Sequence, residues 1–311
     1  MVDKLMGTAA TEFAGLRVVV CGSASPLGND PDRAQACIAV VTPEHLFLFD
    51  VGAGSPQKIQ AAQLPINRLT AVFLTHFHSD HIAALPDVNL NSRVLGRTGH
   101  LQVLGPTGVD KVVAGFNLAY QLDTDYRIAH HGTDLMPRVG AELEATEIKP
   151  GIVWKDDKIT VSAFLVDHSP ISPALGYRVD YGDRSVVISG DTIAVASLFE
   201  AAAKADLLFH DALSPSVIRI FIDSAKKAGR DRIARIMQDV TDYHADITAL
   251  ESMSQSAGVK QLVLYHLVPV PANILLENMF RQDIGSATIL ADDLMYFDLP
   301  AGSSDIIMGK L

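Results

Sequence analysis

Three histidines and an aspartate crowd into the six residues from His76 to His81, directly after the short apolar run 71–74. His76 and His78 stand two positions apart, so an extended backbone points both side chains to the same side. Asp80 and His81 follow where a turn would enter a helix. Imidazole and carboxylate groups without a thiolate suit zinc, with manganese or iron as alternatives. The cluster therefore predicts a metal site at the end of a buried strand.

Further candidate ligands follow apolar runs in the second half of the chain: His168, Asp191 and His266. Taken singly, each could be an ordinary surface or core residue. Taken with the first cluster, they form a set of ligands at strand ends, where a rigid scaffold commonly carries its functional groups.

Both halves of the chain alternate β-rich runs with helical patterns. In the first half, strands are expected at 17–21, 37–41, 45–49, 71–74 and 101–104, and helices at 56–62 and 109–120. In the second half, strands are expected at 158–166, 175–179, 184–189, 206–209 and 261–265, and helices at 193–203 and 245–257. This order predicts an α/β fold, a four-layer αββα sandwich that forms one domain over residues 1–311.

A helical insert is expected at about 214–242. Apolar residues recur there at helical spacing, with a break near Gly229. The insert could be a helical hairpin packed on the body, a lid over a pocket or a dimer contact. The sequence leaves these alternatives open.

The charge balance argues against a polyanion partner. The formal net charge is −11, whereas proteins that grip nucleic acid usually cluster Lys and Arg against phosphates. No apolar run is long enough for a transmembrane helix, and residues 1–16 lack the shape of a signal peptide. We therefore expect a cytoplasmic protein with no membrane partner, and a homodimer is the default expectation.

The two cysteines, Cys21 and Cys37, form no C-x-x-C motif, which excludes a thiolate metal site. Both lie in apolar surroundings, so buried free thiols are the expected state. A disulfide between them stays open as an alternative.

The whole set of histidines and aspartates resembles the metallo-β-lactamase superfamily: H-x-H-x-D-H, a later histidine, an aspartate after Ser-Gly, and a late histidine. The resemblance covers nearly the whole chain and implies the fold of that superfamily with two Zn²⁺ ions (Mn²⁺ or Fe as alternatives). It implies that His76, His78 and His168 hold one ion, that Asp80, His81 and His266 hold the second, and that Asp191 bridges both. It also implies that Asp50 orients the ligating histidines.

Two divalent ions that share a water make hydroxide available near neutral pH. The resemblance thus implies a metal-dependent hydrolase of ester bonds that uses a metal-bridging hydroxide, with Asp80 among its catalytic residues. A non-catalytic metal-binding or redox module is a third possibility.

Two branches of the superfamily compete. The run His210-Asp211-Ala212 and the later His244 resemble ribonuclease Z, an endoribonuclease that processes tRNA 3′ ends. The resemblance implies that His244 is a general acid, with an ordinary capping histidine as the alternative. His210 would support the ligands or be a plain core residue.

Other features resemble an arylsulfatase-like branch, namely the run 21–26, the run 126–131 and the Leu-Val-Pro that follows His266. No basic arm of the ribonuclease Z kind is visible. His130 and His131 line a substrate pocket in this interpretation, or belong to a plain loop. The leading hypothesis is therefore a hydrolase of small-molecule esters of the aryl sulfate, phosphodiester or lactone type, and the alternative is a tRNA 3′-processing endoribonuclease.

Overall fold

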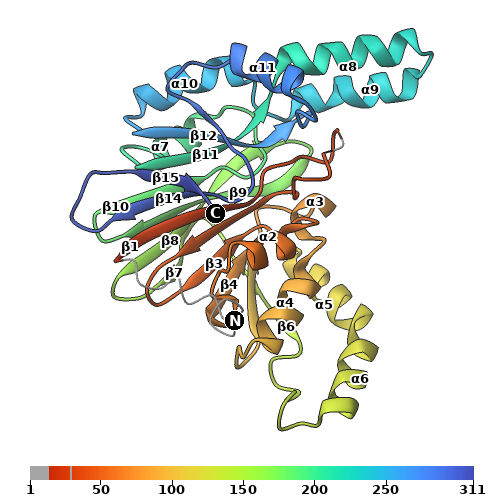
Figure 1. Cartoon of the computed structure of the whole chain (residues 1–311), viewed down its shortest axis with the longest axis vertical. Helices are drawn as coiled ribbons and strands as arrows, with labels where there is room; N and C mark the ends of the chain where they lie inside the picture. The colour runs from red at the N-terminus through yellow and green to blue at the C-terminus, as the bar shows by residue number, and fades with distance from the viewer. Residues whose placement is uncertain (1–13, 29) are drawn as a thin grey trace. The chain divides into compact units, whose positions relative to one another are not determined.

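The computed structural model describes residues 14–28 and 30–311 (Figure 1). Most of the N-terminal stretch used for the localisation expectation, residues 1–13, therefore lies outside the described residues. The chain divides into two compact units, each of them a β-sheet with helices. The first unit comprises Met1–Gly22, Ala34–Lys149 and Asp293–Leu311, and the second comprises Ser23–Arg33 and Pro150–Asp292.

The sheet of the first unit has eight strands in the order β15-β14-β1-β2-β3-β4-β5-β6. Its strands are β1 (Gly15–Gly22), β2 (Cys37–Val41), β3 (Leu46–Phe49), β4 (Leu69–Phe73), β5 (Leu101–Gly105), β6 (Leu143–Glu147), β14 (Met295–Pro300) and β15 (Ile307–Lys310). Pairing is antiparallel from β15 to β3 and parallel from β3 to β6. Its helices are α2 (Ser55–Ala61), η2 (Ile66–Arg68), α3 (Ser79–Ile82), α4 (Leu85–Val94), α5 (Val109–Ala119) and α6 (Gln121–His131).

Strands β2 and β3 are buried at every residue, in keeping with their unbroken apolar sequences. Leu48 and Val72 from the sheet pack in one cluster with Ile59 of α2 and Val88 of α4. Parallel β3 and β4 end at the same edge of the sheet, and the loops that follow them carry the candidate metal residues of this unit. The core thus fixes the position of both loops.

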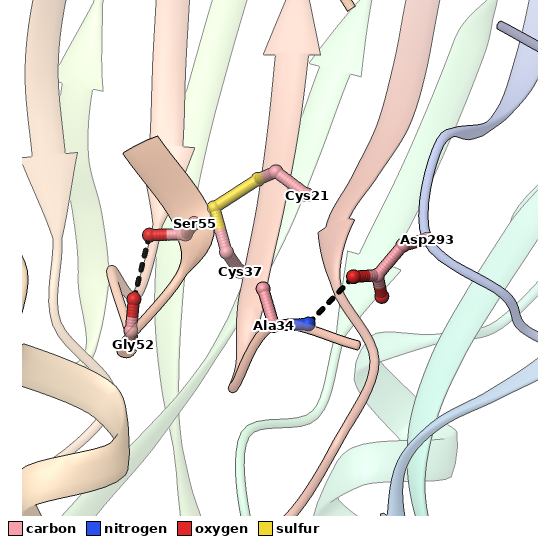
Figure 2. Close-up of a disulfide and its surroundings, with 6 residues drawn as sticks. All are labelled: Cys21, Ala34, Cys37, Gly52, Ser55 and Asp293. Carbon is pink, nitrogen blue, oxygen red and sulfur yellow. Dashed lines mark hydrogen bonds between the residues drawn. A yellow bond between two sulfur atoms is a disulfide. The ribbon is translucent and has the colours of Figure 1, made fainter. Parts of the chain in front are cut away.

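Cys21 and Cys37 form a disulfide, with their Cα atoms 4.9 Å apart (Figure 2). The prediction of buried free thiols is therefore wrong. Strand β1 pairs with β2 through a register shift between Val20 and Gly22, and Cys21 sits in this bulge. A bulge re-aims the side chain that it contains, an effect that the spacing of two cysteines in a sequence does not reveal.

The sheet of the second unit has seven strands in the order β13-β12-β11-β10-β9-β8-β7. Its strands are β7 (Gly151–Lys155), β8 (Ile159–His168), β9 (Ile171–Tyr181), β10 (Arg184–Ile188), β11 (Leu207–Leu213), β12 (Gln261–Val268) and β13 (Ile289–Leu290). Strands β7 to β10 pair antiparallel, and β10 to β13 pair parallel. Its helices are α7 (Ala196–Ala201), α8 (Pro215–Lys227), α9 (Asp231–Asp239), η3 (Val240–Asp242), α10 (Ile247–Ser256) and α11 (Ile274–Gln282).

The expected elements are present with two differences. Strands β11 and β12 continue past His210 and His266, which were expected to end them. The stretch that contains His130 and His131 is helix α6 and not a loop. The helical pattern at 214–242 is confirmed as α8 and α9, with Gly229 between them at a φ of 66°.

In the described part of the chain, every helix is too short or too polar to span a bilayer.

The disulfide yields a stability prediction. It closes a loop of 16 residues, and the chain-entropy estimate for such a loop is about 3 kcal/mol. We expect reduction to lower the free energy of unfolding by about this amount in urea titrations. The control is the Cys21→Ala/Cys37→Ala variant, whose stability should not respond to reductant. Two free thiols in the unreduced, unfolded wild-type protein would contradict the disulfide.

Candidate metal centre

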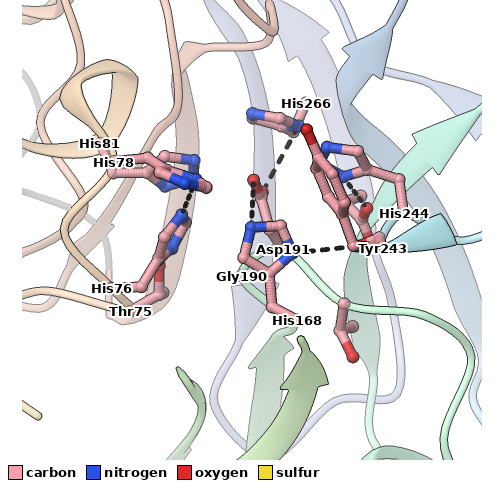
Figure 3. Close-up of polar contacts among 12 residues, drawn as sticks. Thr75, His76, His78, His81, His168, Gly190, Asp191, Tyr243, His244 and His266 are labelled. Carbon is pink, nitrogen blue, oxygen red and sulfur yellow. Dashed lines mark hydrogen bonds and ion pairs between the residues drawn. The ribbon is translucent and has the colours of Figure 1, made fainter. Parts of the chain in front are cut away.

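The first cluster lies in the first unit, with His76 and His78 in the loop after β4 and Asp80 and His81 in helix α3 (Figure 3). His76, Asp80 and His81 are buried, whereas His78 is partly exposed. The ring centroids of His76 and His81 lie 4.1 Å apart, and Nε2 of His76 lies 2.9 Å from Nδ1 of His78. Nε2 of His81 lies 3.4 Å from a carboxylate oxygen of Asp80. The structure therefore brings these four predicted residues together.

Asp50, which follows β3, holds this cluster in place. Its carboxylate accepts hydrogen bonds from the backbone N–H of Thr75 (2.9 Å) and from the Thr75 hydroxyl (2.8 Å). The same carboxylate lies 2.8 Å from Nδ1 of His81. Asp50 has a φ of 58°, a left-handed conformation that aspartate tolerates better than most residues. Asp50 thus makes the contacts that the expected orienting role requires.

These contacts fix the protonation of two imidazoles. A carboxylate only accepts, so Nδ1 of His81 carries a proton, and in the neutral ring Nε2 keeps its lone pair. The Thr75 hydroxyl gives its single proton to Asp50, so it accepts from Nδ1 of His76 at 3.0 Å. Nε2 of His76 is then also unprotonated. One buried carboxylate thereby prepares two ring nitrogens as metal ligands.

The second cluster lies within the second unit, where His168 is the last residue of β8. Its Nδ1 donates to the backbone carbonyl of Tyr243 at 2.9 Å, which leaves Nε2 unprotonated (Figure 3). Burial lowers the pKa of His168 below its ordinary value, although nearby Asp191 opposes this. A neutral imidazole is the form that binds a metal.

Asp191 stands between two imidazoles. It follows β10 through Gly190, whose φ is 63°. One carboxylate oxygen lies 3.8 Å from Nε2 of His168, and the other lies 3.4 Å from Nδ1 of His266. His266 sits where β11 and β12 shift register, with a φ of 44°. This bulge lets His266 leave the strand alternation while β12 continues.

A buried histidine–carboxylate pair adjoins these residues. Nδ1 of His244 lies 2.9 Å from one carboxylate oxygen of Asp211. Nδ1 of His210 lies 3.1 Å from the other carboxylate oxygen of the same residue. Burial alone would raise the pKa of Asp211, but the hydrogen bonds with His210 and His244 hold it below its ordinary value. Ligand atoms of Asp191, Asp211 and His244 all lie within 4.8 Å of one another.

Sequence reasoning missed three contributors. Thr75 precedes the first cluster, Tyr243 precedes His244, and Asp211 was only part of a quoted motif. Asp211 carried a usable signal, because a carboxylate inside the otherwise apolar run of β11 needs a partner. The backbone carbonyl of Tyr243 leaves no signal in the sequence, because every residue has a backbone carbonyl.

His130 and His131 end helix α6 and are both exposed. Their ring centroids are 4.7 Å apart in an edge-on contact. Their placement in a substrate pocket stays a prediction.

The donor sets fit divalent metal ions. Each unit gathers buried imidazole and carboxylate groups, with no thiolate, and their Nδ1 contacts leave ring nitrogens for a metal. This donor set suits zinc, and it suits manganese or iron as well.

Comparison with known proteins identifies the family. The model of the family described as "Metallo-beta-lactamase superfamily" matches residues 30–238, more than half of the chain. The chain belongs to this superfamily. A ribonuclease Z from Mycobacterium sp. is 35% identical over 256 residues, which cover 82% of this chain and 85% of that protein. A ribonuclease Z from Mycobacterium bovis is 36% identical over 261 residues, covering 82% and 86%.

Solved structures share the fold. The metallo-beta-lactamase fold protein YhfI from Bacillus subtilis has a TM-score of 0.65 at 16% identity, over 95% of this chain and 100% of that one. The short form of human tRNase Z has a TM-score of 0.64 at 20% identity, over 91% and 99%. The predicted fold class, two sheets flanked by helices, and the predicted class of metal-dependent hydrolase are thereby confirmed.

The Asp50 network predicts a stability effect that is independent of metal. In Asp50→Ala, the buried donors of Thr75 and His81 lose their acceptor, which should lower the free energy of unfolding by about 3 kcal/mol. Urea titration of chelator-treated protein measures this loss. The matched control is Asp87→Ala on the exposed side of α4, which should change the stability by less than about 0.5 kcal/mol. Equal stability of the two variants would refute the role of Asp50.

Proposed function

We propose that the protein is a metal-dependent phosphodiesterase of the ribonuclease Z kind, which cleaves precursor tRNA near its 3′ end. The observation that carries this proposal is the 35% identity to ribonuclease Z over 82% of the chain. The His244–Asp211 pair supports it, because cleavage of a phosphodiester needs a proton for the leaving oxygen. These observations favour nucleic acid over the small-ester substrates first expected.

The metal ligands assigned by the sequence motif remain part of the proposal. They are His76, His78, Asp80 and His81 in the first unit and His168, Asp191 and His266 in the second. Two zinc ions held there would supply an activated water nucleophile and stabilise negative charge on the phosphate. Asp50 and the Tyr243 carbonyl orient ligating histidines, and His210 supports Asp211.

His244 is proposed to deliver the proton. Its Nδ1–H points at the Asp211 carboxylate, so the other ring nitrogen, Nε2, is the one available to the substrate. The same contact holds the imidazole ring in one orientation. When the phosphorus–oxygen bond breaks, Nε2 gives its proton to the leaving oxygen and the neutral ring keeps its bond to Asp211.

Small-ester hydrolysis is the second candidate, and the interval from His168 to Asp191 favours it. Strands β9 and β10 fill this interval as a hairpin with Gly182 at its turn, so it carries no protruding arm for RNA. The net charge of −11 points the same way. The arylsulfatase-like assignment rests on sequence resemblance alone. The homodimer, the cytoplasmic location and the single-domain organisation stay predictions.

A substrate comparison tests the proposal. Zinc-loaded protein of known metal content should shorten a precursor tRNA with a 3′ trailer, and chelator should abolish the cleavage. The same preparation is assayed with chromogenic aryl sulfate, phosphodiester and lactone substrates. Asp191→Ala should lose bound metal and all activity, which ties the cleavage to this site.

Rapid turnover of a small ester with no cleavage of precursor tRNA would overturn the proposal in favour of the second candidate. Metal analysis of the purified protein accompanies the assay, because a redox-active iron centre without hydrolysis would point to the non-catalytic alternative.

The proton-donor role makes a separate prediction. His244→Ala should keep its bound metal and lower kcat for tRNA cleavage by about 10²- to 10⁴-fold, the usual contribution of a general acid. Asp211→Asn should show a smaller loss of kcat, since the imidazole stays but loses its charged partner. An undiminished kcat in His244→Ala with full metal content would remove this role.

A further inference from the structure

The hairpin formed by α8 and α9 is the most basic stretch of an acidic protein. Residues 219–235 contain six of the 25 Lys and Arg residues of the chain and only two carboxylates. The six cations are all exposed: Arg219, Lys226, Lys227, Arg230, Arg232 and Arg235. We call this set the hairpin cations. Because the whole chain has a net charge of −11, such a local excess stands out against its background.

Most of the hairpin cations have no internal partner. Arg235 pairs with Asp239 one helical turn away, at 2.8 Å. Within residues 14–28 and 30–311, the other five make no ion pair with a carboxylate. Lys226, Lys227 and Arg230 lie within three residues of Gly229, which stands between the two helices. Their charge is therefore available to an outside anion.

The hairpin is built so that its apolar side faces inward. Ile218, Ile222 and Ala225 of α8 pack in one cluster with Ala234 of α9 and Val268 of β12. Ser214 and Ser216 at the start of α8 bond to Asp283, which follows α11. The cations are thus presented by an anchored element.

The two ends of the hairpin lie close in sequence to Asp211 and His244, the proposed proton-donor pair. Asp211 in β11 precedes it by four residues, and His244 stands two residues after the end of η3. The two ends meet where the Leu213 N–H donates to the Ala245 carbonyl at 2.8 Å. The base of the hairpin therefore adjoins the His244–Asp211 pair, and the turn at Gly229 lies one length of α8, about 20 Å, from that base.

We infer that the α8–α9 hairpin binds the phosphate backbone of the RNA substrate and so positions the scissile bond near His244. Unpaired exposed cations at this density are what a polyanion requires, whereas a small ester would need none of them. This inference rests on the proposed function. It supplies a basic surface at a place where sequence analysis expected only a lid, a dimer contact or a packed insert.

A membrane surface is the competing ligand, because basic amphipathic helices also bind anionic lipids. Ile220, Ile233 and Ile236 are only 40–47% exposed, so more than half of each is covered by the protein. These three side chains are partly open to solvent, whereas Ile218, Ile222 and Ala234 are buried in the hydrophobic cluster, so much of the apolar side of the hairpin is closed to a bilayer. The exposed cations around the turn favour RNA, because its phosphate backbone presents negative charges at regular intervals.

The test compares two triple variants of the full-length, metal-loaded protein. The hairpin variant is Lys226→Gln/Lys227→Gln/Arg230→Gln. The control is Lys111→Gln/Lys149→Gln/Lys155→Gln, which removes three exposed cations elsewhere. In the hairpin variant we expect KM for precursor tRNA to rise about tenfold at 0.1 M salt, and the slope of log KM against log salt to fall by about 2 to 3. Turnover of a chromogenic phosphodiester should equal that of wild type.

The outcomes separate the two proposals. If wild-type protein cleaves precursor tRNA and the two variants have equal KM values, the hairpin inference is wrong while the proposed function stands. If wild-type protein neither binds nor cleaves precursor tRNA, the proposed function itself fails. Unchanged KM for tRNA together with lost sedimentation on phosphatidylserine vesicles would replace RNA by a membrane surface.

Discussion

The carboxylate of Asp50 is the interaction on which the first metal-binding cluster depends. It accepts from the backbone and hydroxyl of Thr75 and from His81, and through the hydroxyl it also sets the proton on His76. A buried carboxylate is costly unless its oxygens are satisfied, so this position tolerates few arrangements of its partners. The loops after β3 and β4 meet at one edge because the two strands are parallel, and the sheet core fixes that edge.

In the second unit, different acceptors orient the histidine rings. His168 is oriented by the Tyr243 carbonyl, and His244 is oriented by Asp211. In each case Nδ1 is engaged and the opposite nitrogen is left for chemistry. The two acceptors differ in kind, since Tyr243 offers a neutral carbonyl and Asp211 a carboxylate. The acceptor alone does not set the role of a histidine, because the candidate ligand His81 also bonds to a carboxylate, that of Asp50.

The α8–α9 hairpin lies between Asp211 and His244 in the chain, so the proposed RNA contact and the proposed proton donor belong to one stretch of sequence. An acidic protein that acts on RNA needs a local cluster of cations, because the excess of carboxylates elsewhere on its surface repels the phosphate backbone. The net charge of the chain, which weighed against nucleic acid in the sequence, describes the average surface and not the hairpin. Average charge is therefore a weak guide when the contact surface is a single protruding element.

The sequence by itself determined the fold family and the candidate ligands, because closely spaced metal-binding residues and strand-end positions are local patterns that survive without coordinates. The helical nature of 214–242 was also readable from apolar spacing. Only the tertiary structure decided the Cys21–Cys37 disulfide, the helical state of α6 and the placement of His266 in a bulge. It also decided the roles of Thr75, Asp211 and the Tyr243 carbonyl. Apart from the helical state of α6, which has no buried residue, each of these depends on which segments become neighbours after folding. Long-range pairing and register leave no trace in local periodicity.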